Sequence, residues 1–464
     1  PCYDTQTLRL KGRTIATPFR LVLKAAEEHQ ELECTAILRN LPGKRLVCSG
    51  TWNHRQSVVA KIFIDPSGAE RHYQRELRGI NALENAQIPT PKLLFRGTLV
   101  DGLAPLLLFQ KMEGFETLSE RLSTMISPDD RLATLRPAVE FIARLHNAGL
   151  KQRDIHPGNF LLSANQVMII DGDDIEFPCH GPLSQKESMS NLALFFAQFY
   201  PGFDPLVPSL LTIYGNCRDW QLNSEIREAI QQEILRWRNW RQKKYLRKIQ
   251  RSCSAFIVKK NWSQFMACDR AWYSPAVQKL LDHPDTYIDA GTILKDGNTS
   301  TEAHDSIGSQ TLVIKSYNIK NTRHAKRRCL RPSRAMVSWK NAHRLRFLGI
   351  ATPRPLALIE ERWGGLRKQA YFIMTHLSGQ TIDHVIRDAI NDSQALESYL
   401  DQLAELLKQL AAAQISNGDF KATNFLVSSG QLYLVDLDGM QTHRSSSSFQ
   451  RTFHKDLLRL QRNW

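Results

Sequence analysis

Two segments of the chain contain the same three polar residues at the same spacing. Each has an Asp, an Asn five positions later, and a second Asp seventeen positions after the first. These residues are Asp154, Asn159 and Asp171 in one segment, and Asp419, Asn424 and Asp436 in the other. Because self-similarity of this kind indicates a repeated structural unit, we expect a duplicated domain.

The three residues suit phosphoryl transfer, a reaction in which a protein mainly positions its substrates and stabilises charge on the phosphates. In a D-x-x-x-x-N loop the Asp accepts the proton of the acceptor hydroxyl, and the Asn holds Mg²⁺. We therefore predict Asp154 and Asp419 as catalytic bases. Oxygen atoms are the ligands that this cation prefers. The predicted magnesium ligands are Asn159, Asp171, Asn424 and Asp436.

A lysine precedes each segment on a short apolar strand. Lys61 and Lys315 each follow three apolar residues, in stretches rich in β-branched side chains. Each lysine would bind the α- and β-phosphates of ATP as a point charge. Glu76, in a helical stretch over 70–86, can pair with Lys61. We predict Lys61, Glu76 and Lys315 as nucleotide-binding residues.

The second half lacks a counterpart of Glu76. Alignment of the two halves places Ser338 at the corresponding position of a helical stretch over 333–348. No acidic residue lies between Lys315 and Glu360. The second half has therefore either lost this ion pair or positions its lysine differently.

Single residues of these types are usually structural. A lone Lys on a strand is usually a solvent-facing charge, and a lone Asp before a turn usually forms a cap or a turn. Here an ordered set occurs twice, and this agreement favours a functional interpretation. Asp173 and Asp438, two residues after each second Asp, also repeat, but capping or turn formation could account for both.

The order of elements is the same in both halves: a strand with Lys, a helix, further strands, a helix, the Asp-Asn loop, and a strand that ends in Asp. This order predicts an α+β fold of two tandem protein-kinase-like domains, each with a small β-rich N-lobe and a mostly helical C-lobe. We place the first domain at 1–252, with a basic C-terminal helix, and the second at 253–464, with a short C-lobe.

Several stretches carry a resemblance to a known family, and they cover 49–52, 145–150, 153–161, 294–301, 330–335, 352–357 and 418–426. There the chain resembles the kinase-like superfamily and, more closely, the lipopolysaccharide core heptose kinases, from about residue 44 to the end. The resemblance implies ATP-dependent phosphorylation of an inner-core sugar hydroxyl at the cytoplasmic membrane face. Neither half has a G-x-G-x-x-G loop, so the cover over ATP should differ from that of protein kinases.

The composition is that of a soluble globular protein. Of 464 residues, 42% are hydrophobic and 23% charged, and no apolar run reaches the ~18 residues of a membrane span. The eight cysteines are scattered without a CxxC pair, which favours reduced thiols over metal ligation. With no secretory signal pattern at the start of the sequence, we expect a cytoplasmic protein.

The formal charge of +15 is concentrated around 236–251, where eight Lys and Arg residues alternate with Trp and Tyr. Read as a helix over 225–251, this stretch has apolar residues mostly on one side and cations on the rest. Two interpretations stay open: a solvated surface helix, or a face that contacts an anionic membrane surface. No RNA- or DNA-binding motif accompanies the charge, so no nucleic-acid partner is expected.

The acceptor is expected to be small. Neither half has the long activation segment and Ala-Pro-Glu anchor that follow the second Asp in protein kinases, which favours a small or carbohydrate acceptor over a protein. The resemblance implies that this acceptor is a sugar of lipopolysaccharide. Two alternatives remain: a small-molecule kinase of the aminoglycoside or choline type, and a partly inactive pseudokinase-like scaffold that binds lipopolysaccharide.

Overall fold

The computed structural model contains both helices and strands, so the α+β prediction is confirmed. The described residues are 1–24, 29–125, 127–164, 166–177, 181–297, 300–317, 331–363 and 366–462. Contacts divide the chain into two compact units, one of residues 1–199 and 203–238 and one of 200–202 and 239–464. The division falls within helix α7 (Ser224–Lys248), and the predicted domain boundary after residue 252 stays a prediction.

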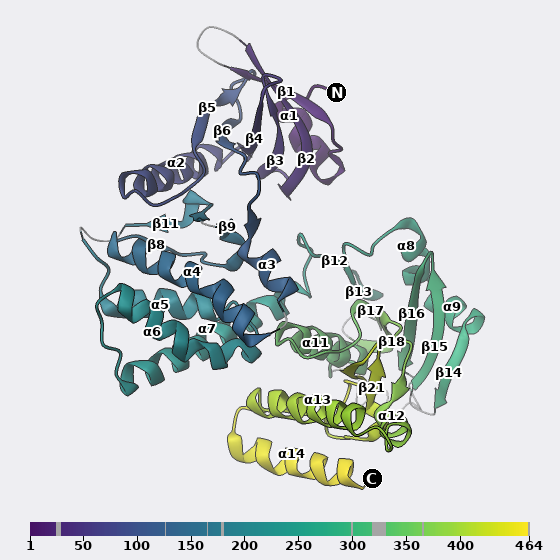
Figure 1. Cartoon of the computed structure of the whole chain (residues 1–464). Helices are drawn as coiled ribbons and strands as arrows, with labels where there is room; N and C mark the ends of the chain where they lie inside the picture. The colour runs from purple at the N-terminus through teal and green to yellow at the C-terminus, as the bar shows by residue number, and fades with distance from the viewer. Residues whose placement is uncertain are drawn as a thin grey trace. The chain divides into compact units, whose positions relative to one another are not determined.

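The first unit begins with a short helix, α1 (Thr5–Lys11), and a closed six-stranded barrel in the order β1-β2-β3-β4-β6-β5 (Figure 1). The strands are β1 (Phe19–Lys24), β2 (His29–Leu41), β3 (Arg45–Trp52), β4 (Gln56–Phe63), β5 (Leu93–Leu99) and β6 (Pro105–Gln110). Val58, Ala60 and Ile62 of β4 are buried in the barrel core. Because side chains alternate along a strand, Lys61 points away from that core, toward the helix that follows.

The rest of the first unit is mostly helical. After α2 (Ala69–Asn85), its helices are α3 (Leu118–Thr124), α4 (Pro128–Asn147), α5 (Gln185–Phe196), α6 (Val207–Cys217) and α7. Its short strands are β7 (Glu116–Thr117), β8 (Lys151–Gln152), β9 (Phe160–Leu162), β10 (Val167–Ile169) and β11 (Ile175–Glu176). The ring of Phe160 packs edge-on against Phe141 of α4 and Phe195 of α5, so buried aromatic contacts hold the loop that contains Asn159.

The second unit contains a seven-stranded sheet in the order β12-β13-β17-β18-β16-β15-β14. The strands are β12 (Phe256–Lys260), β13 (Gln264–Asp269), β14 (Thr292–Gly297), β15 (Ser300–Ile307), β16 (Gln310–Tyr317), β17 (Pro355–Trp363) and β18 (Leu366–Thr375). Helices α8 (Pro275–Asp282) and α9 (Pro284–Ala290) cover one face, and α11 (Arg334–Phe347) covers the other. Leu312 and Ile314 pack on the α8 and α9 side, so Lys315 points toward α11.

A helical part completes the second unit. Its elements are β19 (Gln380–Thr381), α12 (Ile382–Asp388), α13 (Ser393–Ala412), β20 (Ile415–Ser416), β21 (Phe425–Ser428), β22 (Gln431–Leu434), β23 (Gln441–Thr442) and α14 (Ser446–Gln461). The rings of Phe420 and Phe425 lie 5.4 Å apart in the core that α13 covers. These two buried rings flank the loop with Asn424, as Phe160 does in the first unit.

Helix α7 covers most of the stretch that was read as a basic helix over 225–251. Ile230 and Ile234 are buried, whereas Lys243, Lys244 and Arg247 are exposed. Arg238 departs from the expected pattern, because it is buried and makes a bidentate ion pair with Asp204. Among the residues described, no helix is both long and apolar enough to span a bilayer.

Candidate active site

In the first unit, three of the predicted site residues form one ion-pair cluster. Lys61 Nζ on β4 lies 2.5 Å from Glu76 Oε1 on α2 and 3.2 Å from Asp171 Oδ1, which follows β10. Glu76 is fully buried, and the side chains of Lys61 and Asp171 are each 14% exposed. The two carboxylates therefore hold the lysine ammonium group between them.

The turn after β10 is unusual in its backbone. Asp171 adopts the left-handed conformation with a φ of 76°, which Asp tolerates better than most residues. Gln152 Nε2 donates hydrogen bonds to the carbonyl groups of Ile170 at 3.2 Å and Asp171 at 3.1 Å. The amide of Gly172 donates to Glu76 Oε1 at 3.0 Å. The turn is thus held from both sides, which fixes the direction of the Asp171 carboxylate.

Helix α2 packs directly on this turn. A Cβ atom added at Gly79 would lie 1.9 Å from the carbonyl oxygen of Gly172, and one added at Gly172 would lie 2.7 Å from that of Glu76. Any larger residue at Gly79 would push the helix away. Close packing of these two glycines therefore brings Glu76 within reach of Lys61.

The loop between β8 and β9 brings the other two predicted residues together. Asn159 Nδ2 donates to the carbonyl oxygen of Asp154 at 3.0 Å, and the amide of Ile170 donates to the carbonyl of Asn159 at 2.9 Å. The Asn159 amide nitrogen is thereby used within the loop, so its side-chain oxygen is the atom left for a cation. The Asp154 side chain is exposed, where an acceptor can reach it.

Opposing charges keep Lys61 and Asp171 ionised. Burial alone would raise the pKa of Asp171, but the cations of Lys61 and Arg45 outweigh burial and hold that pKa below its usual range. Burial alone would lower the pKa of Lys61, and the carboxylates of Glu76 and Asp171 reverse this and raise it. Lys61 and Asp171 therefore face each other as opposite charges near neutral pH.

Asp173 has a structural use that the sequence did not indicate. Its carboxylate contacts three cationic or titratable side chains of β3 and α2. They are Arg45 Nη1 at 3.6 Å, His72 Nδ1 at 3.2 Å and Arg75 Nε at 3.1 Å. In the second unit, Asp438 pairs with Arg334 of α11. In both units this Asp therefore ties a helix to the loop that follows the site Asp, and in the first unit it also ties strand β3 to that loop.

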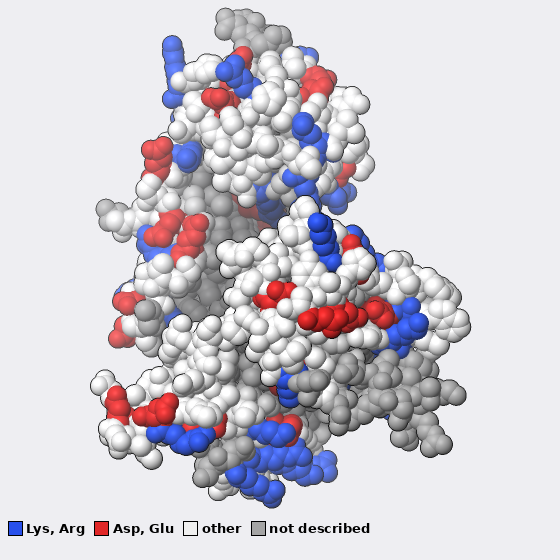
Figure 2. All heavy atoms as spheres, turned by 90° about the vertical axis from the view of Figure 1, so that its right-hand side faces the viewer, with Lys and Arg blue, Asp and Glu red and all other residues white. Residues whose placement is uncertain are grey.

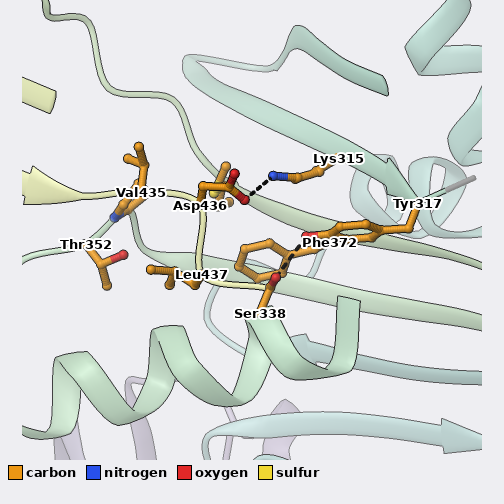
Figure 3. Close-up of a pocket in the computed structure, with 10 residues that line it drawn as sticks. Lys315, Tyr317, Ser338, Thr352, Phe372, Val435, Asp436 and Leu437 are labelled. Carbon is orange, nitrogen blue, oxygen red and sulfur yellow. Dashed lines mark hydrogen bonds and ion pairs between the residues drawn. The ribbon is translucent and has the colours of Figure 1, made fainter. Parts of the chain in front are cut away.

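The second unit repeats the arrangement of the first. Lys315 Nζ lies 2.7 Å from Asp436 Oδ1, and Asp436 also has a left-handed backbone, with a φ of 56° (Figure 3). Asn424 Nδ2 donates to the carbonyl oxygen of Asp419 at 2.8 Å, and the amide of Val435 donates to the carbonyl of Asn424 at 2.9 Å. The nine predicted site residues therefore fall into two clusters, which share the Lys-Asp ion pair and the Asp-Asn loop.

Electrostatics in the second cluster follow the same rule. Burial alone would lower the pKa of Lys315, but Tyr317, Glu302 and Asp436 reverse this and raise it. Burial alone would raise the pKa of Asp436, and the nearby Lys315 instead lowers it. The ion pair between Lys315 and Asp436 is therefore stable over the neutral pH range.

Sequence reasoning missed the second carboxylate beside Lys315. Glu302 Oε1 on β15 lies 3.0 Å from Lys315 Nζ, so the second unit positions its lysine differently rather than leaving it with a single partner. The two-residue turn Gly308-Ser309 sets the register of the β15–β16 hairpin and places Glu302 opposite Lys315, a signal that could have identified it.

Asp456 is another residue that the sequence did not single out. It lies on α14 and is buried, and its Oδ2 accepts hydrogen bonds from the amides of Asn417 at 2.9 Å and Gly418 at 3.0 Å. Arg459, one turn later, contacts Asp419 Oδ1 at 3.7 Å. Helix α14 therefore anchors the loop that carries the predicted base.

The residues present fit a magnesium ion that is shared with a phosphate ligand. Each cluster offers one carboxylate and one side-chain amide oxygen, and Mg²⁺ commonly takes one or two carboxylates plus substrate phosphates. Within the described ranges there is no group of three or more His, Cys, Asp or Glu residues that could hold a metal ion. Asn159 with Asp171, and Asn424 with Asp436, are the residues that would hold the ion.

Residues 46–177 and 297–464 match the Lipopolysaccharide kinase (Kdo/WaaP) family. The chain belongs to the lipopolysaccharide kinase family. The matched segments contain all nine predicted site residues, and the predicted family is confirmed. A comparison with curated proteins found no match. Because this is a kinase family, the match supports a kinase in general.

Proposed function

We propose that this lipopolysaccharide kinase family member is an ATP-dependent enzyme that phosphorylates a sugar hydroxyl of lipopolysaccharide, with an inner-core heptose as the acceptor. We further propose that each unit is a kinase-like domain with its own N-lobe and C-lobe. The observation that carries the proposal is that one ion pair of Lys and Asp, with an Asn loop beside it, is built twice, at 3.2 Å and 2.7 Å. Independent repetition of a buried, ionised cluster favours chemistry over a structural role.

Each residue type has a defined task in the proposed reaction. Lys61 and Lys315 bind the α- and β-phosphates of ATP through their ammonium groups. Magnesium, when bound, offsets negative charge on the transferring phosphate. The side-chain oxygens listed for each cluster orient that ion, and Asp154 and Asp419 accept the proton of the sugar hydroxyl as it attacks.

The surroundings of Asp419 support an anionic acceptor. Lys421 Nζ lies 2.6 Å from Asp419 Oδ2, and Arg459 lies beside the same carboxylate. Helix α14 also exposes Arg451 and Lys455, and the residue after it, Arg462, is exposed too. Lys and Arg side chains gather at the lower edge of the face in Figure 2, the level at which Figure 1 draws α14. A phosphorylated or carboxylated sugar core would find complementary charge there.

The exposed side of α7 supports contact with the inner face of the cytoplasmic membrane. Lys243, Lys244 and Arg247 are exposed, Trp240 is 50% exposed, and the sequence has no acidic residue over 234–268. A cation near an anionic membrane contributes about 1 kcal/mol, and Trp suits the membrane interface. The full chain should sediment with vesicles of phosphatidylglycerol but not with vesicles of phosphatidylcholine. A variant with the three cations changed to Ala should not sediment with either kind of vesicle. If the parent and the variant sedimented equally, α7 would be a solvated surface helix.

The reaction is tested with purified lipopolysaccharide, an aminoglycoside panel and ATP labelled on its γ-phosphate. We expect label in lipopolysaccharide when Mg²⁺ is present, and none with the double variant Asp171→Asn, Asp436→Asn. Label in an aminoglycoside alone would indicate a small-molecule kinase. Binding of lipopolysaccharide without any transfer would indicate a scaffold, and either outcome would overturn the proposal.

A further inference from the structure

The two units hold their lysines by different means. In the first, Glu76 reaches Lys61 from helix α2. In the second, Ser338 occupies the matching position of α11, and its hydroxyl lies 2.8 Å from the hydroxyl of Tyr317. Ser338, Lys315 and Asp436 line one small cavity, drawn in Figure 3, whose volume of about 10 Å³ suits one water molecule. The helix therefore supplies no carboxylate to Lys315.

A neighbouring strand supplies the carboxylate instead. Glu302 and Lys315 are directly opposite each other in the antiparallel pair β15–β16, and side chains in such a pair lie on the same face of the sheet. Their charged atoms are 3.0 Å apart, and the Lys315 side chain is only 5% exposed. In the first unit the residue opposite Lys61 is Val47, which has no charge to offer. The carboxylate beside the lysine thus comes from a helix in the first unit and from a strand in the second.

We propose that Glu302 is the positioning residue for Lys315, and that it replaces from within the sheet the carboxylate that Glu76 supplies from a helix. This inference rests on the proposed function, in which Lys315 binds phosphate. Glu302 lies on the strand next to that of Lys315, so the position of its carboxylate depends on the register of the β15–β16 hairpin.

The difference predicts different regulation of the two sites. Glu76 binds both Lys61 and the amide of Gly172, so a displacement of α2 would disturb the lysine and the Asp171 turn together. In the second unit α11 contacts the corresponding turn through Asn341 Nδ2, which donates to the carbonyl groups of Leu437 at 2.9 Å and Met440 at 3.1 Å. Those bonds do not involve Lys315. Helix α11 therefore supplies neither of the carboxylates that hold Lys315, although its Arg334 pairs with Asp438 of the same turn.

The first test measures Mg-ATP binding to the full chain with Asp171→Asn, which leaves the second site as the one that binds. Adding Glu302→Gln should weaken binding roughly tenfold to a hundredfold, the loss expected when a charged hydrogen-bond partner is removed. Asp305→Asn is the matched control, because it removes one charge from the opposite face of β15 and should change nothing. Moving the carboxylate back to the helix, with Ser338→Glu and Tyr317→Phe added to Glu302→Gln, should restore part of the binding. Loss without any rescue, or no loss with Glu302→Gln, would overturn the proposal.

A second measurement needs no nucleotide, and it tests the pairing of Glu302 with Lys315 separately from the proposed function. Denaturant unfolding of Glu302→Gln, Lys315→Met and the double variant forms a double-mutant cycle. We expect Glu302→Gln to shift the unfolding midpoint less when Lys315 is already Met. If this coupling is present while the parent binds no ATP at its second site, the proposed function fails there and the pairing stands. If the two shifts simply add, Glu302 does not hold Lys315 and the inference is wrong.

Discussion

At the scale of single residues, Asp171 and Asp436 show how backbone conformation serves a site. Both follow a buried strand and both adopt positive φ, which turns the carboxylate back toward a lysine. Asp suits this position because its backbone tolerates the left-handed region and its side chain offers oxygen atoms that can bind a cation. The sequence shows the Asp and its spacing, but the backbone conformation comes from the hydrogen bonds of Gln152 and Glu76 around the turn.

Substitution of Asp171 by Asn keeps the shape of the side chain and removes its charge. We expect Mg-ATP binding at the first site to weaken roughly tenfold to a hundredfold, because a hard cation loses its anionic ligand. Asp219→Asn is the matched control, since Asp219 also has a positive φ of 52° but is exposed and lies outside the cluster. Titration calorimetry of both variants in an Asp436→Asn background checks this. Equal affinities would show that Asp171 is not a metal ligand.

At the scale of elements, helix α2 depends on one buried residue. Glu76 accepts hydrogen bonds from Lys61 and from the amides of Gly172 and Asp173. Glu76→Ala leaves a buried cation with one partner fewer and should lower the free energy of unfolding by about 3–5 kcal/mol. Glu84→Gln, an exposed change on the same helix, should stay within about 0.5 kcal/mol. If denaturant unfolding gave the two variants similar stability, the cluster would not hold α2.

Three helices of the first unit meet at a buried histidine. His146 Nδ1 lies 2.7 Å from the Tyr214 hydroxyl, and its Nε2 lies 3.1 Å from Asn191 Oδ1. Burial lowers the pKa of His146 to about 4. Between pH 6.5 and 4 the unfolded chain therefore binds a proton that the folded chain does not, so stability falls as the pH falls.

The stability cost of this histidine should reach about 2 kcal/mol at pH 5. Denaturant unfolding at pH 7.5 and pH 5 measures it, and His146→Gln provides the comparison because Gln does not titrate. The variant should lose less stability than the parent between the two pH values. Identical losses would mean that His146 is not held neutral in the folded state.

Local pattern predicted the local elements well. The helices expected over 70–86 and 333–348 are α2 (Ala69–Asn85) and α11 (Arg334–Phe347), and the Asp-Asn loops lie where the spacing placed them. The closed barrel and the pairing of β13 with β17 were not predicted, because strand order depends on pairing between distant residues. Asp456 was missed for the same reason, since it binds a loop almost forty residues away.

At the scale of the whole molecule, the family match in two segments and the two ion-pair clusters agree. Each compact unit contains a complete set of a lysine, an Asp-Asn loop and a second Asp. The two sets differ in what holds the lysine, Glu76 from a helix or Glu302 from a strand. Both sets keep the residues that the proposed chemistry needs, so we predict that both units are catalytic.

The most direct test of two active units is phosphate transfer from labelled ATP to lipopolysaccharide by the full chain, Asp154→Ala, Asp419→Ala and the double variant. We predict that each single variant loses part of the transfer and that the double variant loses about 10²–10⁴-fold, the typical cost of removing a general base. Circular dichroism should show all four proteins folded. Full transfer by the double variant would contradict the assignment of both bases, and complete loss with Asp154→Ala alone would show that the second unit does not catalyse.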